Sequence, residues 1–172
     1  APKTYLKAGM GIKPLSPYQS RDIPIGLATD GAASSNTLDL YEQMRLMALT
    51  QKQTEHDATA MPIDEVLSIA FPGGARVCQQ EQLGNLEAGA LADIVLLRQD
   101  RSAALPRINP GANLVYSLNA CDVDTVICNG TVLMKEKQHL TIDKEKVKRE
   151  VESRVSRLVE RIPGRKVAVY PT

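Results

Sequence analysis

The sequence has few of the side chains that mark most metal, membrane and nucleic-acid sites. It contains no Trp, one Phe and two His among 172 residues, so its core must be built from Leu, Val, Ile, Ala and Met. The formal charge is only +1, which gives no indication of a basic surface for nucleic acid. No apolar run approaches the roughly 20 residues that a membrane-spanning helix needs, and the N-terminus lacks a secretory signal pattern. We therefore expect a cytoplasmic protein with neither a nucleic-acid nor a membrane partner.

Cysteine and histidine are too sparse to form a recognisable metal site. The three cysteines, Cys78, Cys121 and Cys128, are odd in number and lack metal-ligand spacing, so we expect reduced, mostly buried thiols. His56 and His139 stand in polar connections far apart in the chain, which favours surface positions over ligand roles. What remains, 43% hydrophobic and 24% charged residues, is ordinary globular composition and suits an α/β protein.

One stretch ends an apolar run at a carboxylate. Residues 23–28 alternate large apolar side chains with small residues, which is typical of a short buried strand. Asp30 follows this run, and a small polar loop over 31–36 leads to a helix that opens near Leu38. These elements form one β/α unit, whose functional residues lie at the strand's C-terminal tip. From spacing alone, the simpler interpretation is that Asp30 caps the turn with its own side chain.

A resemblance to a known family favours a functional role for Asp30 over a capping role. Residues 26–36 read Gly-Leu-Ala-Thr-Asp-Gly-Ala-Ala-Ser-Ser-Asn, and with the Glu-Gln-Met-Arg run at 42–45 they resemble the last barrel strand and following helix of the amidohydrolase superfamily. The branch they resemble contains cytosine-deaminase-like and chlorohydrolase-like enzymes, including methylthioadenosine and S-adenosylhomocysteine deaminases. In that family the matching Asp binds the catalytic metal and shuttles the proton of the attacking water. The resemblance therefore implies that Asp30 is a metal ligand and a catalytic residue, with Ser35 and Asn36 as candidates for substrate contact.

The same resemblance implies an α/β fold: the C-terminal part of a (β/α)₈ TIM-type barrel plus the C-terminal strands of a small composite β-sandwich domain. A second match, Gly-X-Leu-X-X-Gly-X-X-Ala-Asp followed by an apolar strand, begins at Gly84. In the superfamily the chain there leaves the barrel for the β-sandwich, and Asp93 has a structural role. The expected division is 1–82 for the last barrel units, 83–140 for the β-sandwich portion with an inserted barrel-packing helix near 110–118, and 141–172 for a C-terminal helix and tail.

Local patterns place the remaining elements. The first twelve residues resemble the loop after the seventh barrel strand, where Lys3, Thr4 and Tyr5 either contact substrate or belong to a solvated chain end. The Asn-Gly pair at 129–130 between two β-branched runs predicts a β-hairpin over 123–134. Further elements are expected as helices over 16–22, 38–52, 61–70 and 143–161, a helix of doubtful continuity over 71–78, a strand over 94–97, a loop and short helix over 109–118, and a terminal strand over 167–170.

Length and ligand count limit what this chain can catalyse. A (β/α)₈ barrel needs about 250 residues, and the resemblance begins in the middle of the family pattern, so we expect the first part of the protein to be missing. The family supplies a His-X-His pair, two further His and an acid/base Glu, of which nothing matches here. One carboxylate alone does not retain a catalytic metal. We therefore expect Zn²⁺ or Fe²⁺ in the complete enzyme and none bound by this chain alone.

Two hypotheses follow. In the first, the chain is part of a hydrolytic deaminase or dechlorinase, in which metal-bound hydroxide attacks an aminated or chlorinated heterocycle, and the isolated chain is inactive. In the second, it is a non-catalytic folded fragment that acts only by self-association or by complementing its missing N-terminal half. Because the predicted strand over 23–28 would have unpaired edges, we expect a homo-oligomer or a complex with that missing half.

Overall fold

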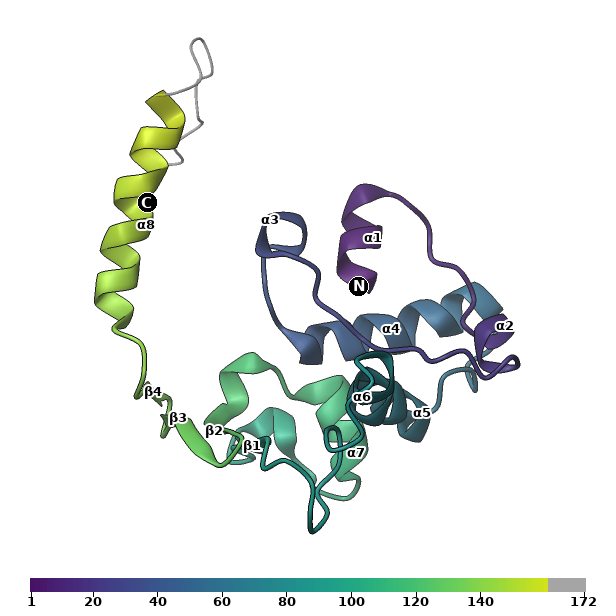
Figure 1. Cartoon of the computed structure of the whole chain (residues 1–172). Coiled ribbons are helices and arrows are strands. Elements are labelled where there is room, and N and C mark those ends of the chain that lie inside the picture. The colour runs from purple at the N-terminus through teal and green to yellow at the C-terminus, as the bar shows by residue number, and fades with distance from the viewer. Residues whose placement is uncertain (161–172) are drawn as a thin grey trace.

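A computed structural model describes residues 1–160 as a helical body, a small sheet and a projecting helix (Figure 1). The body surrounds α4 (Leu40–Glu55), the sheet holds β1 to β4, and α8 (Lys144–Glu160) extends away from both. The chain is thus mixed α/β as expected, but no barrel is formed by the described residues.

Helix α4 organises the body because its two ends are fixed and one face is apolar. The Asp39 side chain caps its N-terminus by accepting hydrogen bonds from the backbone N–H groups of Tyr41 and Glu42 at 2.9 and 3.1 Å. His56 ends the helix in the left-handed conformation, with φ 53°. The helix predicted over 38–52 is therefore confirmed, with both ends displaced toward the C-terminus. The core that it forms comprises Met44, Met47, Ala48, Met61, Val66, Ile69 and Val115.

The N-terminal segment is a helix, and the prediction of a loop there is wrong. Helix α1 (Pro2–Ala8) carries proline in its first turn, where the missing N–H costs nothing. Gly9 ends it with φ 64°, and its N–H bonds back to the Leu6 carbonyl. Both signals stand in the sequence, and the family loop pattern obscured them. The short helices α2 (Ser16–Gln19) and α3 (Ala32–Ser35) follow.

Three consecutive helical segments follow α4 in the chain, and the first of them, α5, packs against it. Helix α5 (Ile63–Ser68) begins directly after Pro62 and continues into a π-helical turn, η1 (Ile69–Gly73), and then into α6 (Gly74–Val77). Pro72 lies inside η1. Since proline has no N–H and its ring crowds the preceding turn, the wider π-helical geometry accommodates it. Continuity of the helix past Pro72, doubtful from sequence, is therefore preserved.

The segment over 23–29 does not form the predicted strand. It has no regular secondary structure, yet the side chains of Ile25, Leu27 and Thr29 are half-buried while their neighbours are exposed. Ile25 and Leu27 pack against the core cluster. This alternation is typical of a strand with one covered face, but a strand also needs a neighbour's backbone groups. None of the described residues provides them, so the ladder is absent.

The sheet is antiparallel in the order β1 (Ile94–Leu97), β2 (Val123–Cys128), β3 (Thr131–Lys135) and β4 (Gln138–His139). The predicted strand over 94–97 and the hairpin over 123–134 are both confirmed. Asn129 and Gly130 make the turn with φ 45° and 76°, as a two-residue hairpin loop requires. The Asp93 carboxylate accepts a hydrogen bond from the Asn129 N–H at 2.6 Å, which is a structural role.

A chain of short helical turns connects β1 to β2 and returns to the body. Among them, α7 (Pro110–Ala112) and the π-helical η3 (Asn113–Ser117) form the short helix predicted over 109–118. Val115 in η3 is fully buried in the core around α4. The 3₁₀ turns η2 (Ser102–Ala104) and η4 (Ala120–Asp122) complete the connection.

The exposure of the cysteines differs from the prediction. Cys78, Cys121 and Cys128 are all exposed, so the prediction of mostly buried thiols is wrong; they lie at a helix end, a turn and a strand end, where little packs over them. The helix predicted over 143–161 is present as α8, while the terminal strand over 167–170 lies outside the described residues. Within residues 1–160, no helix combines the length and apolar character needed to cross a membrane.

Candidate functional site

Asp30 lies between the irregular segment over 23–29 and helix α3. Its backbone is left-handed, with φ 61°, a conformation that Asp tolerates better than most residues. One carboxylate oxygen accepts a hydrogen bond from the N–H of Gly31 at 2.6 Å, and the side chain is exposed. This bond, above all, holds the pKa of the Asp30 carboxyl below its usual value. The carboxylate is therefore ionised and accessible at neutral pH.

Two hydroxyls from different elements approach Asp30. Thr4 on α1 and Ser34 on α3 both lower the pKa of the Asp30 carboxyl. The Thr4 oxygen is buried and makes no hydrogen bond within normal geometric limits to any residue of the described range. Helix α1 thus brings one of its three candidate residues to the carboxylate. Ser34 was not among the predicted contacts, although its small polar loop was recognised.

Lys3 and Tyr5 are directed elsewhere. The Lys3 ammonium forms an ion pair with Glu42 at 2.7 Å and donates to the Thr37 hydroxyl at 2.8 Å. This pair holds the pKa of the Glu42 carboxyl below its usual value. Tyr5 is 45% exposed and lines a cavity of about 310 Å³ that also contains Tyr18. Lys3 therefore ties α1 to the start of α4. Tyr5 lines a cavity that Gly26 and Leu27, from the segment before Asp30, also line.

The loop residues Ser35 and Asn36 have mainly structural contacts. The buried Ser35 hydroxyl donates to the Thr37 carbonyl at 2.6 Å. Asn36 ends α3 with φ 65°, and its side-chain oxygen accepts from the Lys7 ammonium at 2.5 Å. Lys7 also donates to the carbonyl of Ser34 at 2.5 Å. Sequence reasoning missed Lys7, because nothing in its local pattern indicates a contact 27 residues away.

A buried amide completes the junction between α1 and α4. Gln43 is fully buried, and its side-chain oxygen accepts from the backbone N–H of Lys3 at 3.1 Å, which satisfies one open donor at the N-terminus of α1. The Gln43 side-chain nitrogen has no hydrogen-bond partner among the described residues. No sequence signal distinguished this residue from the rest of the helix.

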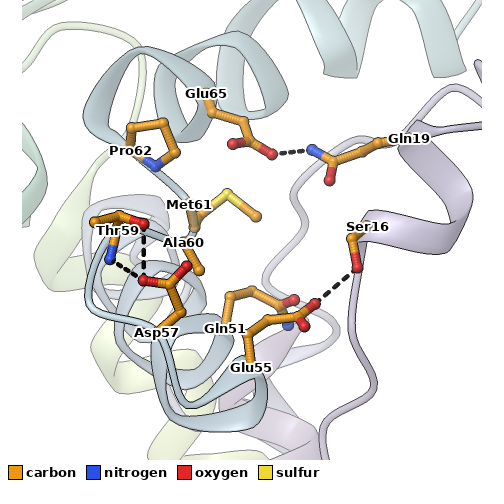
Figure 2. A pocket seen from close by; sticks show the side chains of 10 residues that line it. All are labelled: Ser16, Gln19, Gln51, Glu55, Asp57, Thr59, Ala60, Met61, Pro62 and Glu65. Atoms are coloured by element: carbon orange, nitrogen blue, oxygen red, sulfur yellow. Dashed lines mark hydrogen bonds between the residues drawn. The ribbon is translucent and has the colours of Figure 1, made fainter.

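A second hollow of about 380 Å³ lies between α2, the end of α4 and the start of α5 (Figure 2). Three carboxylates line it, and each is already bonded to a neutral neighbour (Figure 2). Ser16 donates to Glu55 at 2.7 Å, Gln19 donates to Glu65, and Thr59 donates to Asp57 at 2.7 Å. The two hydroxyls of the hollow are bonded to carboxylates, and none of the described residues that line it is His, Cys or Lys, so it lacks the imidazole or amine base that usually activates such a nucleophile.

Metal binding requires more ligands than the described residues bring together. No cluster of three or more His, Cys, Asp or Glu side chains with suitable geometry occurs within residues 1–160. Catalytic zinc sites normally have three protein ligands and an open position. Asp30 offers a single exposed carboxylate, so the described part of this chain does not fit a complete metal site.

Comparison with known proteins identifies the family. Residues 1–133 match the amidohydrolase family. The chain is 41% identical to a 5-methylthioadenosine/S-adenosylhomocysteine deaminase of Desulforudis audaxviator, over 94% of this chain and 38% of that protein. It is 39% identical to a 5'-deoxyadenosine deaminase of Methanosphaera stadtmanae, over 84% of this chain and 34% of that protein.

Comparison with solved structures leads to the same group of enzymes. A crystal structure of an adenosine deaminase from Xanthomonas campestris with bound zinc superposes with a TM-score of 0.89 at 25% identity, over 93% of this chain and 37% of that one. The atrazine chlorohydrolase of Arthrobacter aurescens in complex with zinc gives 0.81 at 26% identity, over 88% and 34%. The chain spans a little more than a third of the length of these relatives. It belongs to the amidohydrolase family.

Proposed function

We propose that this chain is the C-terminal part of a metal-dependent amidohydrolase that deaminates an adenosine-type nucleoside by hydrolysis. The observation that carries the proposal is the position of Asp30, an ionised and accessible carboxylate in the motif that resembles the family's metal-binding Asp. The relatives named above support the substrate class, because those similar in sequence are deaminases of adenosine derivatives. The chlorohydrolase is similar at only 26% identity, so deamination is favoured over dechlorination.

In such a reaction, water adds to the ring carbon that bears the amino group, and the C–N bond then breaks to release ammonia. Asp30 would accept a proton from the water and return it to the departing nitrogen. A bound Zn²⁺ or Fe²⁺ would lower the pKa of the water. The Thr4 and Ser34 hydroxyls, both close to Asp30, would keep its carboxylate oriented and ionised.

The remaining ligands would come from polypeptide outside these 172 residues, and we propose that the chain alone is inactive. We also propose the domain division 1–82, 83–140 and 141–172. It is supported by the location of all strands in the described range between residues 94 and 139. Within residues 1–160, no cluster of potential metal ligands occurs. This favours the alternative proposal that the isolated chain is a non-catalytic fragment.

The test compares Asp30→Asn with Asp100→Asn in the full-length protein that carries this sequence. Asp100 is an exposed carboxylate paired with Arg98 at 2.8 Å, so the control makes the same chemical change away from the site. Ammonia release from 5'-deoxyadenosine should fall by about 10²–10⁴-fold for the first variant and remain unchanged for the second. Equal activity of both variants would refute the role of Asp30.

Metal analysis tests the claim about the isolated chain. After incubation with Zn²⁺ and removal of excess metal, the 172-residue chain should retain far less than one ion per molecule. Stoichiometric zinc would contradict our statement that it brings too few ligands.

A further inference from the structure

Lys7 has contacts that the proposed reaction does not use. It lies in the last turn of α1, and its ammonium donates to the carbonyl oxygen of Ser34 and to the side-chain oxygen of Asn36, both at 2.5 Å. Ser34 belongs to α3, and Asn36 is the residue that ends it. The last carbonyl groups of a helix have no partner within that helix, and a lysine side chain can supply one. Lys7 therefore caps α3 from a different element.

A series of hydrogen bonds continues from this cap to the carboxylate of Asp30. The peptide group that joins Ser34 and Ser35 accepts from Lys7 through its carbonyl, and its N–H donates to the carbonyl of Gly31 at 3.0 Å. The N–H of Gly31 then donates to the carboxylate of Asp30 at 2.6 Å. A hydrogen bond to a peptide carbonyl strengthens the bond that the N–H of the same group donates. The ammonium of Lys7 therefore helps to hold the turn that directs the carboxylate.

Helix α1 provides a fixed base for Lys7. Lys3 lies on the same face of the helix, four residues earlier, and forms the ion pair with Glu42 at 2.7 Å. The backbone N–H of Lys3 also donates to the fully buried Gln43 side chain at 3.1 Å. These bonds attach the start of α1 to α4, while Lys7 attaches its end to α3. The turn after Asp30 is thus held against a helix that is itself anchored.

We propose that Lys7 is a positioning residue of the candidate site, which fixes the direction of the Asp30 carboxylate through the peptide of Ser34 and the backbone of Gly31. The proposal rests on the deaminase function proposed above, because the direction of Asp30 matters only if that carboxylate reacts. Lys7 itself contacts no reacting group. A shift of about 1 Å in a reacting group can lower a rate by about 10²-fold. Lys7 is exposed, so water would replace part of its contacts, and we expect a smaller loss.

The experiment measures turnover and hydrogen exchange in the full-length protein that carries this sequence. Lys7→Met removes the ammonium and keeps an apolar side chain of nearly the same length, whereas Lys7→Arg retains donors for both oxygens. Lys52→Met is the matched control. The Lys52 ammonium also bonds two carbonyl oxygens, those of Ala58 at 2.8 Å and Ala60 at 2.5 Å, but it lies in the last turn of α4 and has no bond to the turn after Asp30 among those described.

For Lys7→Met we expect kcat for ammonia release from 5'-deoxyadenosine to fall about tenfold while KM changes less than about twofold, because the direction of Asp30 affects the reaction more than binding. Lys7→Arg should restore most of the turnover, and Lys52→Met should leave both constants unchanged. Amide hydrogen exchange over residues 30–36 should be faster in Lys7→Met than in the parent protein and unchanged in Lys52→Met.

The possible failures can be told apart. Unchanged exchange over residues 30–36 in Lys7→Met, or equal losses of kcat in Lys7→Met and Lys52→Met, would overturn the proposal. If the parent protein is active and Lys7→Met keeps its kcat, the role of Lys7 is refuted and the proposed function stands. If the parent protein releases no ammonia, the proposed function is refuted; in that case faster exchange in Lys7→Met supports the anchoring by Lys7, and unchanged exchange overturns it.

Discussion

Two adjacent glycines should respond in opposite ways to the same substitution. Gly73 and Gly74 both have helical backbone angles, with φ −62° and −59°, so alanine suits either backbone. A Cβ on Gly73 would overlap the carbonyl oxygen of Ile25 and would lie 2.9 Å from that of Ser68. A Cβ on Gly74 would meet nothing within 4 Å. The contacts of the added Cβ, and not the helix propensity, therefore decide whether alanine stabilises or destabilises the chain.

The magnitudes follow from these contacts. Gly74→Ala should stabilise the chain by about 0.5–1 kcal/mol, because alanine restricts the unfolded chain more than glycine does. Gly73→Ala gains the same amount but must displace two backbone carbonyls, and overpacking of this kind costs about 1–3 kcal/mol. Since backbone moves less easily than a side chain, we expect a net loss of about 1–2 kcal/mol. Urea unfolding monitored by circular dichroism would measure both changes.

Gly74→Ala is the matched control, because it makes the same chemical change one residue away. If Gly73→Ala were as stable as the parent chain, the segment over 23–29 would not lie against η1 as described. The packing that positions Asp30 would then be wrong.

Three further outcomes are expected. Asp39→Ala should destabilise the chain by about 1 kcal/mol through loss of the α4 cap, measured by urea unfolding, whereas Asp39→Asn should lose less; equal losses would argue against capping. The pKa of Glu42 is lowered by Lys3, so its contribution to the free energy of unfolding is present above the usual carboxyl pKa and is lost as the pH falls from about 5 toward 3. Thermal unfolding across that range should show a shallower pH dependence for Glu42→Gln, and an unchanged slope would contradict the ion pair. The nearby Asp93 charge raises the pKa of the Cys128 thiol, so Asp93→Asn should speed its reaction with a disulfide reagent at pH 8, and a slower reaction would refute this cause.

Elements determined by local sequence were predictable. The hairpin turn at Asn129 and Gly130 needs two residues that tolerate positive φ, and the sequence supplies them in order. Helix α4 carries its own cap and apolar face, so its existence followed from a 16-residue window. Helix α1 has end signals in its own sequence, Pro2 and Gly9, whereas the family pattern over the same residues predicts a loop.

Features that depend on distant residues were not predictable. The segment over 23–29 has the alternation of a strand, but pairing depends on neighbours that local sequence does not reveal. Around Asp30, the motif predicted the carboxylate itself. The approach of Thr4 and the anchoring of the loop by Lys7 both arise from packing of α1 against α3, between residues about thirty positions apart. The exposure of the three cysteines likewise depends on which distant residues pack near them, and local sequence does not reveal this.

The backbone at Ile25 and Gly26 lies close to the backbone at Gly73 and Gly74, and this contact helps to position Asp30. Gly26 lies so near Gly74 that an added Cβ would stand 3.2 Å from the Gly74 Cα, and Gly73 admits the Ile25 carbonyl in the same way. Sliding the segment by one residue in either direction would bring the side chain of Ile25 or Leu27 to the position of Gly26, where even a Cβ makes tight contacts with Gly74 and Val77. The absence of side chains at Gly26 and Gly73 therefore fixes the register of this segment against η1 and α6. It also fixes the position of Asp30, four residues after Gly26.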